Sequence, residues 1–405
     1  MTAARSVWSG GRRIAYPRDP TLAGLGNLFD TEWVWEAYCQ RFGGRRSDPR
    51  RLAVRLVNHS PGRRILVSYR IDWQRGDYLP SEYFTVLLER GDPVEMFRYP
   101  ADPYLPGLAQ AADPGAAHRL IGRHVLVFPG RRVRVELVRY RPRSRAVLRH
   151  RLGKVKLYVR VMRPAGMPSL LEAAQLVARS GFAAPRVAGR WDDGGVVWLS
   201  EIPGINVRQS LRQGNPPTPD MLLDGLESLW SLPRHTTSAR PFGLRGRYYY
   251  ARRVIRHALE NHRATSALRD TTRVLDRFVD GWAPSGIAHN DFYDDQMIVL
   301  PDGRPALVDF EEAGPGDPML DIGNFLAHLR WNSTFNKNPD GDPNGVYYDL
   351  FRSAALERYR WNEADLNLRE AVCLFRIATN PIRRPRPGWR NKVETGLHLV
   401  NNTLN

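Results

Sequence analysis

The segment from His289 to Asp321 constrains this chain more than any other, because acidic and amide side chains recur in it at fixed spacings. It begins HNDFYDDQ, which places Gln296 five residues after Asp291. A dozen residues later the apolar run PALV ends at Asp309, and the segment closes with GDP and Asp321. A lone Asp and Gln at this spacing would fit an ordinary surface loop, but four such elements in a fixed order favour a shared chemical role.

The residue types match the needs of phosphoryl transfer. That reaction uses a base to orient the attacking hydroxyl, together with an amide oxygen and a carboxylate that hold Mg²⁺ across the nucleotide phosphates. Protein kinases supply these groups from an H-R-D-x-x-x-x-N loop and a D-F-G segment. Here the spacing from Asp291 to Gln296 is the same, the amide belongs to Gln, and the second motif reads V-D-F-E around Asp309.

This variant resembles the aminoglycoside phosphotransferase family, a kinase-like group of bacterial small-molecule kinases. In that family a loop like H-G-D-x-x-x-x-N is followed by an I-D-x strand and a G-D-P…D segment. The resemblance implies that Asp291 is the catalytic residue that orients the acceptor hydroxyl. It also implies that Gln296 and Asp309 bind Mg²⁺, with Gln one methylene longer than the usual Asn.

Other polar residues of the segment have expected roles as well. His289 is expected to brace its loop without reacting. Asp317 and Asp321 resemble the structural acids of the family, which anchor the loop and cap the following helix. Asp294 and Asp295 are expected either to contact a cationic or polyhydroxyl acceptor or to face water.

The charge distribution argues against a nucleic-acid groove. The 405-residue chain has a net charge of +18, but only four of its 60 basic residues are lysines, and the arginines are spread over every part of the sequence. Basic patches are the footprint of phosphate-backbone binding, and no single tract forms one. Residues 281–330 instead hold nine acids and two arginines, a net charge of −7. Acidic residues gathered around the motifs fit a metal site.

Nothing in the sequence indicates a membrane segment. Residues 1–14 contain arginines but no apolar signal-peptide core, and no uncharged apolar run approaches the roughly 18 residues of a membrane span. The two cysteines, Cys39 and Cys373, lie far apart and lack a metal-binding spacing. We therefore expect a globular, cytoplasmic protein, and the sequence leaves its oligomeric state open.

The first half of the chain contains an internal repeat. Fifteen residues from Tyr16 (YPRDPTLAGLGNLFD) match fifteen from Tyr99 (YPADPYLPGLAQAAD) with eight identities at an offset of 83. The likeness continues in the segments that start at Val54 and Val135. Each copy is predicted to form a helix, two strands joined by a Pro-containing turn, and a further strand. Two copies are too few for a solenoid, so we expect a duplicated α+β unit.

The second copy continues into a helix and two strands, an order that resembles the small lobe of a kinase-like fold. From residue 204 onward the apolar spacing is mainly helical. We therefore predict an α+β protein with a bilobal, protein-kinase-like fold and an additional N-terminal cap domain. The cap would cover residues 1–97, the small lobe 98–203 and the large lobe 204–405. Such a cap resembles that of bacterial maltokinase-type sugar kinases, and it is not expected to supply phosphoryl-transfer residues.

One strand, KLYVRVM, carries two candidates for the Lys that usually holds the α- and β-phosphates. Arg160 aligns with that Lys by resemblance, and Lys156 lies four residues earlier on the same strand face. An Arg here is a departure, because its planar fork is not equivalent to an ammonium group. Glu172 is the candidate partner on the next helix. However, SLLE from Ser169 also fits a capping box, in which Glu172 would satisfy a backbone donor at the helix start.

Ser200, Glu201 and Ile202, followed by Pro-Gly, match the interlobe linker that offers backbone groups to adenine. The alternative is a plain strand end with a turn. The turn expected above the phosphates, residues 140–145, contains no glycine. Without glycine its backbone cannot approach phosphates closely, so arginine side chains are expected to substitute.

These features predict a phosphotransferase that uses ATP or GTP and Mg²⁺ to phosphorylate a hydroxyl of a small molecule, such as a sugar or an aminoglycoside-like natural product. One alternative is a kinase for Ser or Thr of a precursor peptide, held by the cap and by the basic loop from Arg383 to Trp389. A second is a pseudokinase that binds a partner protein. Arg160 and the missing glycines suggest it, and the presence of both Asp291 and Asp309 opposes it.

Overall fold

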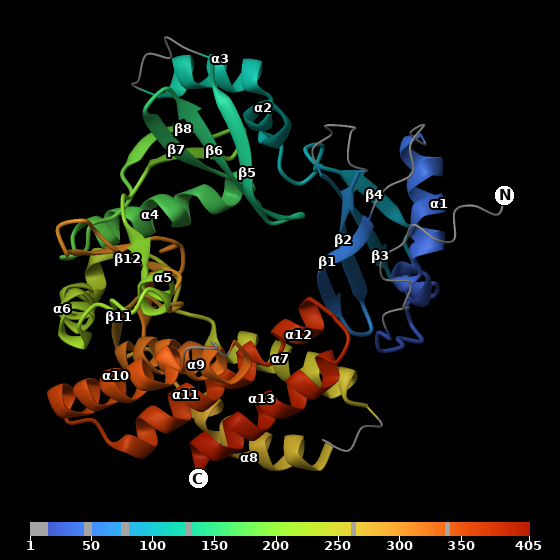
Figure 1. Cartoon of the computed structure of the whole chain (residues 1–405). Coiled ribbons are helices and arrows are strands. Elements are labelled where there is room, and N and C mark those ends of the chain that lie inside the picture. The colour runs from blue at the N-terminus through green and yellow to red at the C-terminus, as the bar shows by residue number, and fades with distance from the viewer. Residues whose placement is uncertain (1–14, 44–50, 74–80, 126–131, 261–264, 337–340) are drawn as a thin grey trace.

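Two β-rich parts and one large helical part make up the computed structural model (Figure 1). The structure describes residues 15–43, 51–73, 81–125, 132–260, 265–336 and 341–405. Residues 1–14, where we expect no signal peptide, lie outside the described residues. Within the described ranges, none of the helices combines the length and the apolar character that crossing a membrane requires.

The N-terminal part, which we call the cap, is an antiparallel sheet with one helix packed on it. Its elements are η2 (Leu25–Phe29), α1 (Thr31–Phe42), β1 (Arg51–Ser60), β2 (Arg64–Asp72), β3 (Glu82–Glu89) and β4 (Glu95–Arg98). The strands lie side by side in chain order, β1-β2-β3-β4. The Asp30 side chain caps α1 by accepting hydrogen bonds from the backbone of Glu32 and Trp33. The buried Tyr38 of α1 packs on Phe84 of β3 and joins helix to sheet.

The second part, the small lobe, is a five-stranded antiparallel sheet with helices on both faces. Its elements are α2 (Leu108–Ala112), α3 (Pro114–His124), β5 (Arg134–Arg141), β6 (Arg145–Leu152), β7 (Val155–Met162), η3 (Pro164–Gly166), α4 (Met167–Ala178), β8 (Val187–Trp191) and β9 (Val196–Ser200). The strand order is β5-β6-β7-β9-β8. Side chains alternate along β9: Val196 and Trp198 pack with α2 and α3, whereas Val197 and Leu199 pack with α4. Polar residues on the α4 face can therefore reach the large lobe.

The third part, the large lobe, is mainly helical. Its helices are α5 (Val207–Arg212), α6 (Pro219–Trp230), η4 (Arg234–Thr236), α7 (Leu244–Ala258), α8 (Thr265–Gly281), α9 (Pro318–Phe335), α10 (Pro343–Tyr359), α11 (Glu363–Ile377), α12 (Asn380–Arg383) and α13 (Trp389–Leu404). Its short strands are β10 (Ile205–Asn206), β11 (Gly286–Ala288), β12 (Met297–Val299), β13 (Pro305–Leu307) and β14 (Gly314–Gly316). They form two small sheets, β10-β12-β13 and β11-β14. Helix α11 contacts α9 and α13, and its Cys373 and Phe375 are fully buried.

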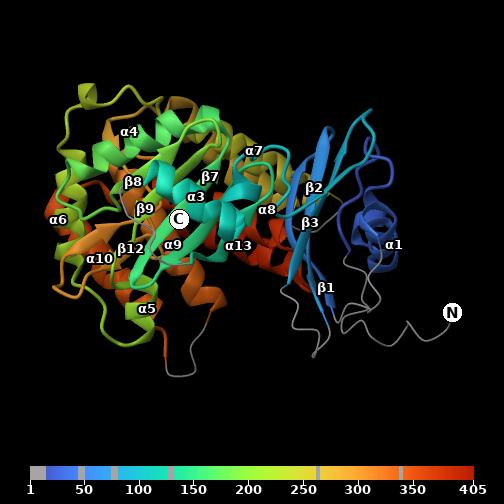
Figure 2. The ribbon, with the colours of Figure 1, turned by 90° about the horizontal axis from the view of Figure 1, so that it is seen from above.

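The observed mixture of sheets and helices agrees with the predicted α+β class. The cap sheet ends at Arg98, one residue beyond the predicted boundary, and the five-stranded sheet and α5 to α13 fall within the other two predicted ranges. The division into three domains itself stays a prediction. Figure 2 shows the cap sheet standing beside the body of the molecule, with α1 on the side away from it.

Each copy of the repeat uses one buried aspartate to tie its beginning to its first hairpin. In the first copy, Asp19 accepts hydrogen bonds from the backbone N–H groups of Thr21 at 3.1 Å and Gly62 at 2.8 Å. Its carboxylate also lies 3.1 Å from Nε2 of His59. Gly62 stands in the turn between β1 and β2 with a φ of 79°, a left-handed conformation that glycine adopts readily.

In the second copy Asp102 takes the place of Asp19. It accepts hydrogen bonds from the backbone N–H groups of Tyr104 at 2.9 Å and Arg143 at 2.8 Å, and from the Tyr140 hydroxyl at 2.9 Å. Arg143 stands in the turn between β5 and β6 with a φ of 62°, which is unfavourable for a residue with a Cβ. The bond to Asp102 holds this turn in place. An aspartate that accepts the backbone N–H of a hairpin turn thus recurs at equivalent positions of the two segments.

Replacing Asp102 by Ala should destabilise the protein by about 2–4 kcal/mol, because three donors, two of them in the β5–β6 hairpin, lose a charged acceptor. Asp113→Ala is the matched control. It removes the exposed carboxylate that caps α3, and it should cost about 1 kcal/mol. Thermal unfolding of both variants measures the difference. Equal shifts in melting temperature would contradict the proposed importance of the Asp102 clamp.

Candidate active site

Two loops of the large lobe bring the sequence motifs together. Residues 289–296 join β11 to β12, and residues 308–313 join β13 to β14. Because β12 and β13 pair, the end of the first loop lies beside the start of the second, and the Val308 N–H donates to the Gln296 carbonyl at 2.9 Å. Asp309 follows with a φ of 60°. This left-handed conformation turns the chain sharply after the strand.

Asp321 on α9 fixes the first loop. Its carboxylate accepts hydrogen bonds from the backbone N–H groups of His289 and Asn290, each at 2.7 Å, and from the Trp230 indole at 3.1 Å. The Asn290 side chain donates to the carbonyl of Glu312 at 2.9 Å and so connects the two loops. The His289 imidazole is buried and has no hydrogen-bond partner among the described residues. His289 therefore braces the loop through its backbone.

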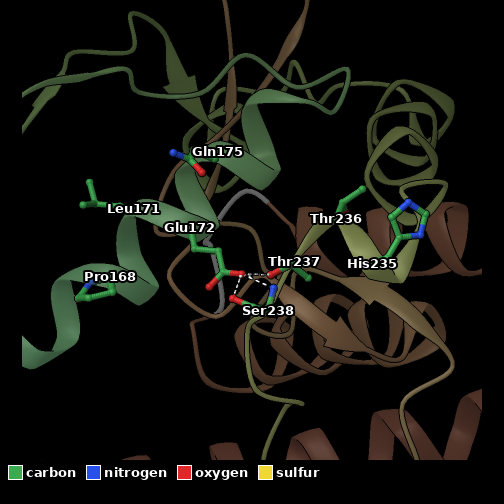
Figure 3. A pocket seen from close by; sticks show the side chains of 8 residues that line it. All are labelled: Pro168, Leu171, Glu172, Gln175, His235, Thr236, Thr237 and Ser238. Carbon is green, nitrogen blue, oxygen red and sulfur yellow. Dashed lines mark hydrogen bonds between the residues drawn. The ribbon is translucent and has the colours of Figure 1, made fainter.

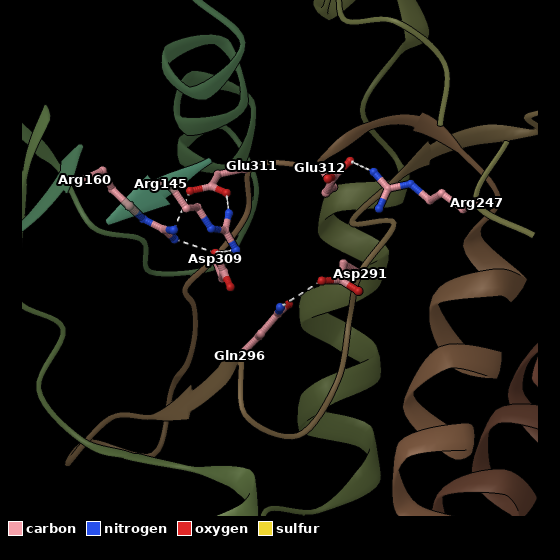
Figure 4. Close-up of polar contacts among 8 residues, drawn as sticks. All are labelled: Arg145, Arg160, Arg247, Asp291, Gln296, Asp309, Glu311 and Glu312. Carbon is pink, nitrogen blue, oxygen red and sulfur yellow. Dashed lines mark hydrogen bonds and ion pairs between the residues drawn. The ribbon is translucent and has the colours of Figure 1, made fainter. Parts of the chain in front are cut away.

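Asp291 and Gln296 meet at the centre of the site (Figure 4). Nε2 of Gln296 donates to Asp291 at 3.3 Å. Burial raises the pKa of Asp291; the Arg376 guanidinium opposes this shift, and the carboxylates of Asp309 and Glu312 add to it. Oε1 of Gln296 is buried without a hydrogen-bond partner in the described part of the chain. Such an acceptor is costly to leave unsatisfied, and a cation would satisfy it.

Two arginines of the small lobe hold two carboxylates of the second loop (Figure 4). Arg160 of β7 contacts Asp309 through Nη2 and Glu311 through Nη1, each at 2.5 Å. Arg145, the first residue of β6, lies 3.6 Å from Asp309 and contacts Glu311 directly. None of the four side chains is more than 19% exposed. Solvent and salt therefore screen their attraction little, and the four charges link the two lobes.

The arginines determine the charge of Asp309. Burial alone would raise its pKa, but the Arg160 and Arg145 guanidinium groups outweigh burial and hold the pKa below its ordinary value. Asp309 is therefore ionised at neutral pH, as a ligand for a hard cation must be.

The structure separates the two candidates on the nucleotide side. Arg160 reaches Asp309, whereas Lys156, four residues earlier on β7, pairs with Glu201 at 2.9 Å. Because Glu201 belongs to the predicted linker, Lys156 lies at the linker end of the strand. Arg160 lies at the motif end, where the phosphates are expected.

The predicted linker connects β9 of the small lobe to β10 of the large lobe. Ser200 ends β9, and its hydroxyl accepts a hydrogen bond from the Arg186 N–H at 2.9 Å. Ile202 is half-buried. Gly204 passes so close to the Val299 carbonyl that a Cβ would collide with it. These residues stand between a sheet and a helical lobe, as predicted, and their contact with adenine stays a prediction.

Glu172 forms neither of the interactions predicted from the sequence, the ion pair with Arg160 and the capping box. Helix α4 begins at Met167, so Glu172 falls in the second turn and the capping box does not form. It does not pair with Arg160 either, since its Oε1 accepts hydrogen bonds from the hydroxyls of Thr237 at 2.7 Å and Ser238 at 2.9 Å and from the Ser238 N–H. Figure 3 shows these contacts in a pocket between α4 and residues 235–238.

Asp294 and Asp295 both pair with Arg208, and Asp295 keeps about a third of its side chain exposed. Asp294 is fully buried, receives two hydrogen bonds from Arg208 at 2.8 and 2.9 Å, and accepts a third from Asn332 at 3.0 Å. Asp295 pairs with the same arginine at 2.6 Å. Asp317 caps α9, as the resemblance implies.

Sequence reasoning missed Glu311 and Arg376, and it anticipated Arg145 only as part of a turn without glycine. Glu311 could have been found, because it is the first of two acids after the V-D-F motif. Arg376 stands on α11, far along the chain from the motifs, and no spacing in the sequence points to it. Only the packing of α11 against α9 brings it close enough to influence the pKa of Asp291.

A second group of possible metal ligands lies where the cap meets α7. Asp19, His59 and His257 each place one ligand atom within 4.8 Å of the others. However, Asp19 already accepts a hydrogen bond from the Gly62 N–H in the first hairpin turn, and Asp102 accepts the equivalent bond from Arg143 in the second. This structural role accounts for the position of Asp19 without a metal.

Comparisons with known proteins place this arrangement in a family. Residues 137–362, more than half of the chain, match the phosphotransferase enzyme family. No curated protein matches the sequence.

Three solved structures are among those similar to this chain. Choline kinase from Cryptosporidium parvum Iowa II is similar with a TM-score of 0.52 and 11% identity, over 72% of this chain and 95% of that chain. A choline/ethanolamine kinase family protein from Mesorhizobium loti has a TM-score of 0.49 and 15% identity, over 73% and 92%. Aminoglycoside phosphotransferase APH(3'')-Id from Streptomyces rimosus has a TM-score of 0.45 and 19% identity, over 61% and 92%. The likeness to the first confirms the predicted bilobal, kinase-like fold.

Arg160→Ala should weaken the binding of a Mg²⁺–ATP analogue about tenfold or more, because it removes a charged donor at the motif end of β7. Lys156→Ala should have a smaller effect. Arg149→Ala, on β6 and paired with Glu136, is the matched control. Calorimetric titration measures all three. The reverse order of the first two would place the phosphates at the linker end of the strand.

Proposed function

The chain belongs to the phosphotransferase enzyme family, and on that premise we propose that it transfers the γ-phosphate of ATP to a hydroxyl group of a small molecule with the help of Mg²⁺. One observation supports the proposal more than any other. The loops that carry Asp291 and Asp309 meet at the junction of the two lobes. Gln296 contacts Asp291 through its side chain and Val308, the neighbour of Asp309, through its carbonyl. GTP is the alternative nucleotide.

The residues present fit Mg²⁺ and nucleotide phosphates. Gln296 offers a buried oxygen without a partner among the described residues, and Asp309 offers an ionised carboxylate. Mg²⁺ takes oxygen ligands of this kind, usually one or two carboxylates together with substrate phosphates. When bound, it would neutralise charge on the phosphate oxygens. Arg145 and Arg160 lie beside Asp309, and their planar guanidinium groups match the geometry of phosphate.

Asp291 is the proposed base. It would accept the hydrogen bond of the acceptor hydroxyl and orient that oxygen for attack. Its raised pKa makes it a stronger proton acceptor than an ordinary aspartate, while Gln296 fixes one of its oxygens. A general base is most effective when its pKa approaches the working pH.

Nucleotide binding would rearrange the arginine pairs. In the observed arrangement, Arg160 is fully engaged by Asp309 and Glu311. Phosphate oxygens would compete for its guanidinium group and for that of Arg145. As they did so, Asp309 would become free to bind Mg²⁺.

The two alternatives receive less support. For a peptide kinase, we expected the basic loop to present Trp389, but this side chain is buried and donates a hydrogen bond to the Ala15 carbonyl at 3.1 Å. For a pseudokinase, the engaged Arg160 is a supporting feature. The assembled Asp291, Gln296 and Asp309 favour an active enzyme.

Asp291→Asn should lower turnover roughly 10²–10⁴-fold and leave nucleotide affinity almost unchanged. In the wild type, kcat/KM should fall as the pH drops through a pKa above 3.8, because Asp291 acts in its ionised form and burial raises its pKa. Transfer of labelled γ-phosphate from ATP to a panel of sugars and natural products measures both effects.

Asp302→Asn is the matched control, because this exposed acid pairs with Arg304 outside the site. It should retain wild-type turnover. If Asp291→Asn also retains near-normal turnover on a true acceptor, the base is a different residue.

A further inference from the structure

The acidic side chains around the site are already committed to arginines. These pairs are Asp309 and Glu311 with Arg145 and Arg160, Glu312 with Arg247, and Asp294 and Asp295 with Arg208. In the part of the chain that the structure describes, Asp291 and Asp321 are the motif acids without an ion pair, and Asp321 is occupied by the His289 and Asn290 N–H groups and the Trp230 indole. A cationic acceptor would therefore find little uncompensated negative charge here.

Another group of arginines near the site lacks acidic partners. Arg139 and Arg141 lie at the end of β5, Arg376 on α11, Arg383 at the end of α12 and Arg384 directly after it. None of the five forms an ion pair with a residue in the described ranges, although Asp309 lies near Arg139 and Arg141, and Asp291 lies near Arg376. Nη1 of Arg376 is buried, and it too lacks a hydrogen-bond partner in those ranges. A buried donor without an acceptor is costly.

These arginines come from both lobes. Arg141 stands opposite Arg145 in the β5–β6 hairpin, and α12 packs against β1 of the cap. In Figure 1, α12 lies below the free end of β5. Burial and the neighbouring arginines, among them Arg139 and Arg383, lower the pKa of Arg141 to about 10. The guanidinium groups stay charged at neutral pH and repel one another.

The position of the group indicates what it would bind. The linker and Lys156 mark the adenine end of the site, and Arg160 marks the phosphates. Arg383 and Arg384 lie toward the cap, because α12 packs against β1. Arg376 stands on α11, which packs against α9, and its guanidinium carbon lies 5.6 Å from the centre of the Phe242 ring. In the proposed function the acceptor hydroxyl binds at Asp291, so a positive charge near Asp291 is placed to contact the acceptor.

We propose that the acceptor is a small hydroxyl compound that carries a phosphate or carboxylate group, bound by Arg376, Arg383 and Arg384 together with Arg139 and Arg141. This inference rests on the proposed function and names its substrate class. Arginine forks bind phosphates and carboxylates through paired, charge-assisted hydrogen bonds, and a bound anion would relieve the repulsion among them.

The transfer step balances with this acceptor. The acceptor hydroxyl oxygen forms a bond to the γ-phosphorus of ATP, and the bond from that phosphorus to the β-phosphate bridging oxygen breaks. ADP leaves with the electron pair, and the hydroxyl proton passes to Asp291 and then to solvent. The anionic group of the acceptor remains on the arginines throughout.

Calorimetry on the full chain tests the anion site directly, with citrate as the carboxylate probe and glucose 6-phosphate as the phosphate probe. Each is titrated with and without saturating AMP-PNP and Mg²⁺. Saturable binding is expected in both conditions, and it should weaken as salt is raised. Arg383→Gln/Arg384→Gln should weaken it about tenfold or more. Arg384→Gln alone, at an exposed position, should weaken it in the same direction and serves if the double variant fails to fold.

Arg119→Gln/Arg123→Gln removes two charges from α3, on the opposite face of the small-lobe sheet, and should leave binding unchanged. The inference is overturned if neither probe binds saturably, or if the two double variants behave alike. It is also overturned if glucose or glucosamine is phosphorylated with a kcat/KM equal to or above that of glucose 6-phosphate and glucuronate. Failure of AMP-PNP to bind in any condition would instead contradict the proposed function, while the anion titrations without nucleotide still test this site.

Discussion

Four charges at the junction of the lobes hold the site in its observed arrangement. Arg145 and Arg160 come from neighbouring strands of the small-lobe sheet, and Asp309 and Glu311 come from one loop of the large lobe. A charge that is mostly buried must be paired, because removing one partner strands the other in a poorly solvated place. The position of each lobe therefore depends on the other.

The clamps described above serve this cluster. Asp102 fixes the turn between β5 and β6, directly before Arg145, and Asp321 fixes the loop that carries Asp291. Protein kinases bind phosphates with a Lys that is paired to a helix Glu. Here Arg160, the proposed counterpart of that Lys, pairs with two acids of the large lobe and not with a helix Glu. Glu172 is then free to join α4 to the segment at Thr237.

Local patterns predicted what is locally encoded. The apolar run before Asp309 forms strand β13, as its sequence indicates. The spacing from Asp291 to Gln296 brings the two side chains into contact. The role of Glu172 could not be predicted, because it is decided by Thr237 and Ser238, hydroxyl residues distant in sequence. The acidic stretch predicted a metal site or a cation-binding surface. The structure shows that arginines from other segments neutralise most of it.

Charge compensation from distant segments is thus the feature that the sequence conceals most completely. It also defines the central claim, that Asp309 exchanges its arginines for Mg²⁺ when nucleotide phosphates arrive. Calorimetry of AMP-PNP binding, with and without Mg²⁺, to the wild type and to Asp309→Ala tests this claim most directly. We expect Mg²⁺ to strengthen binding to the wild type and to have no effect on binding to the variant. A variant that keeps the full Mg²⁺ dependence would place the metal elsewhere and contradict the account.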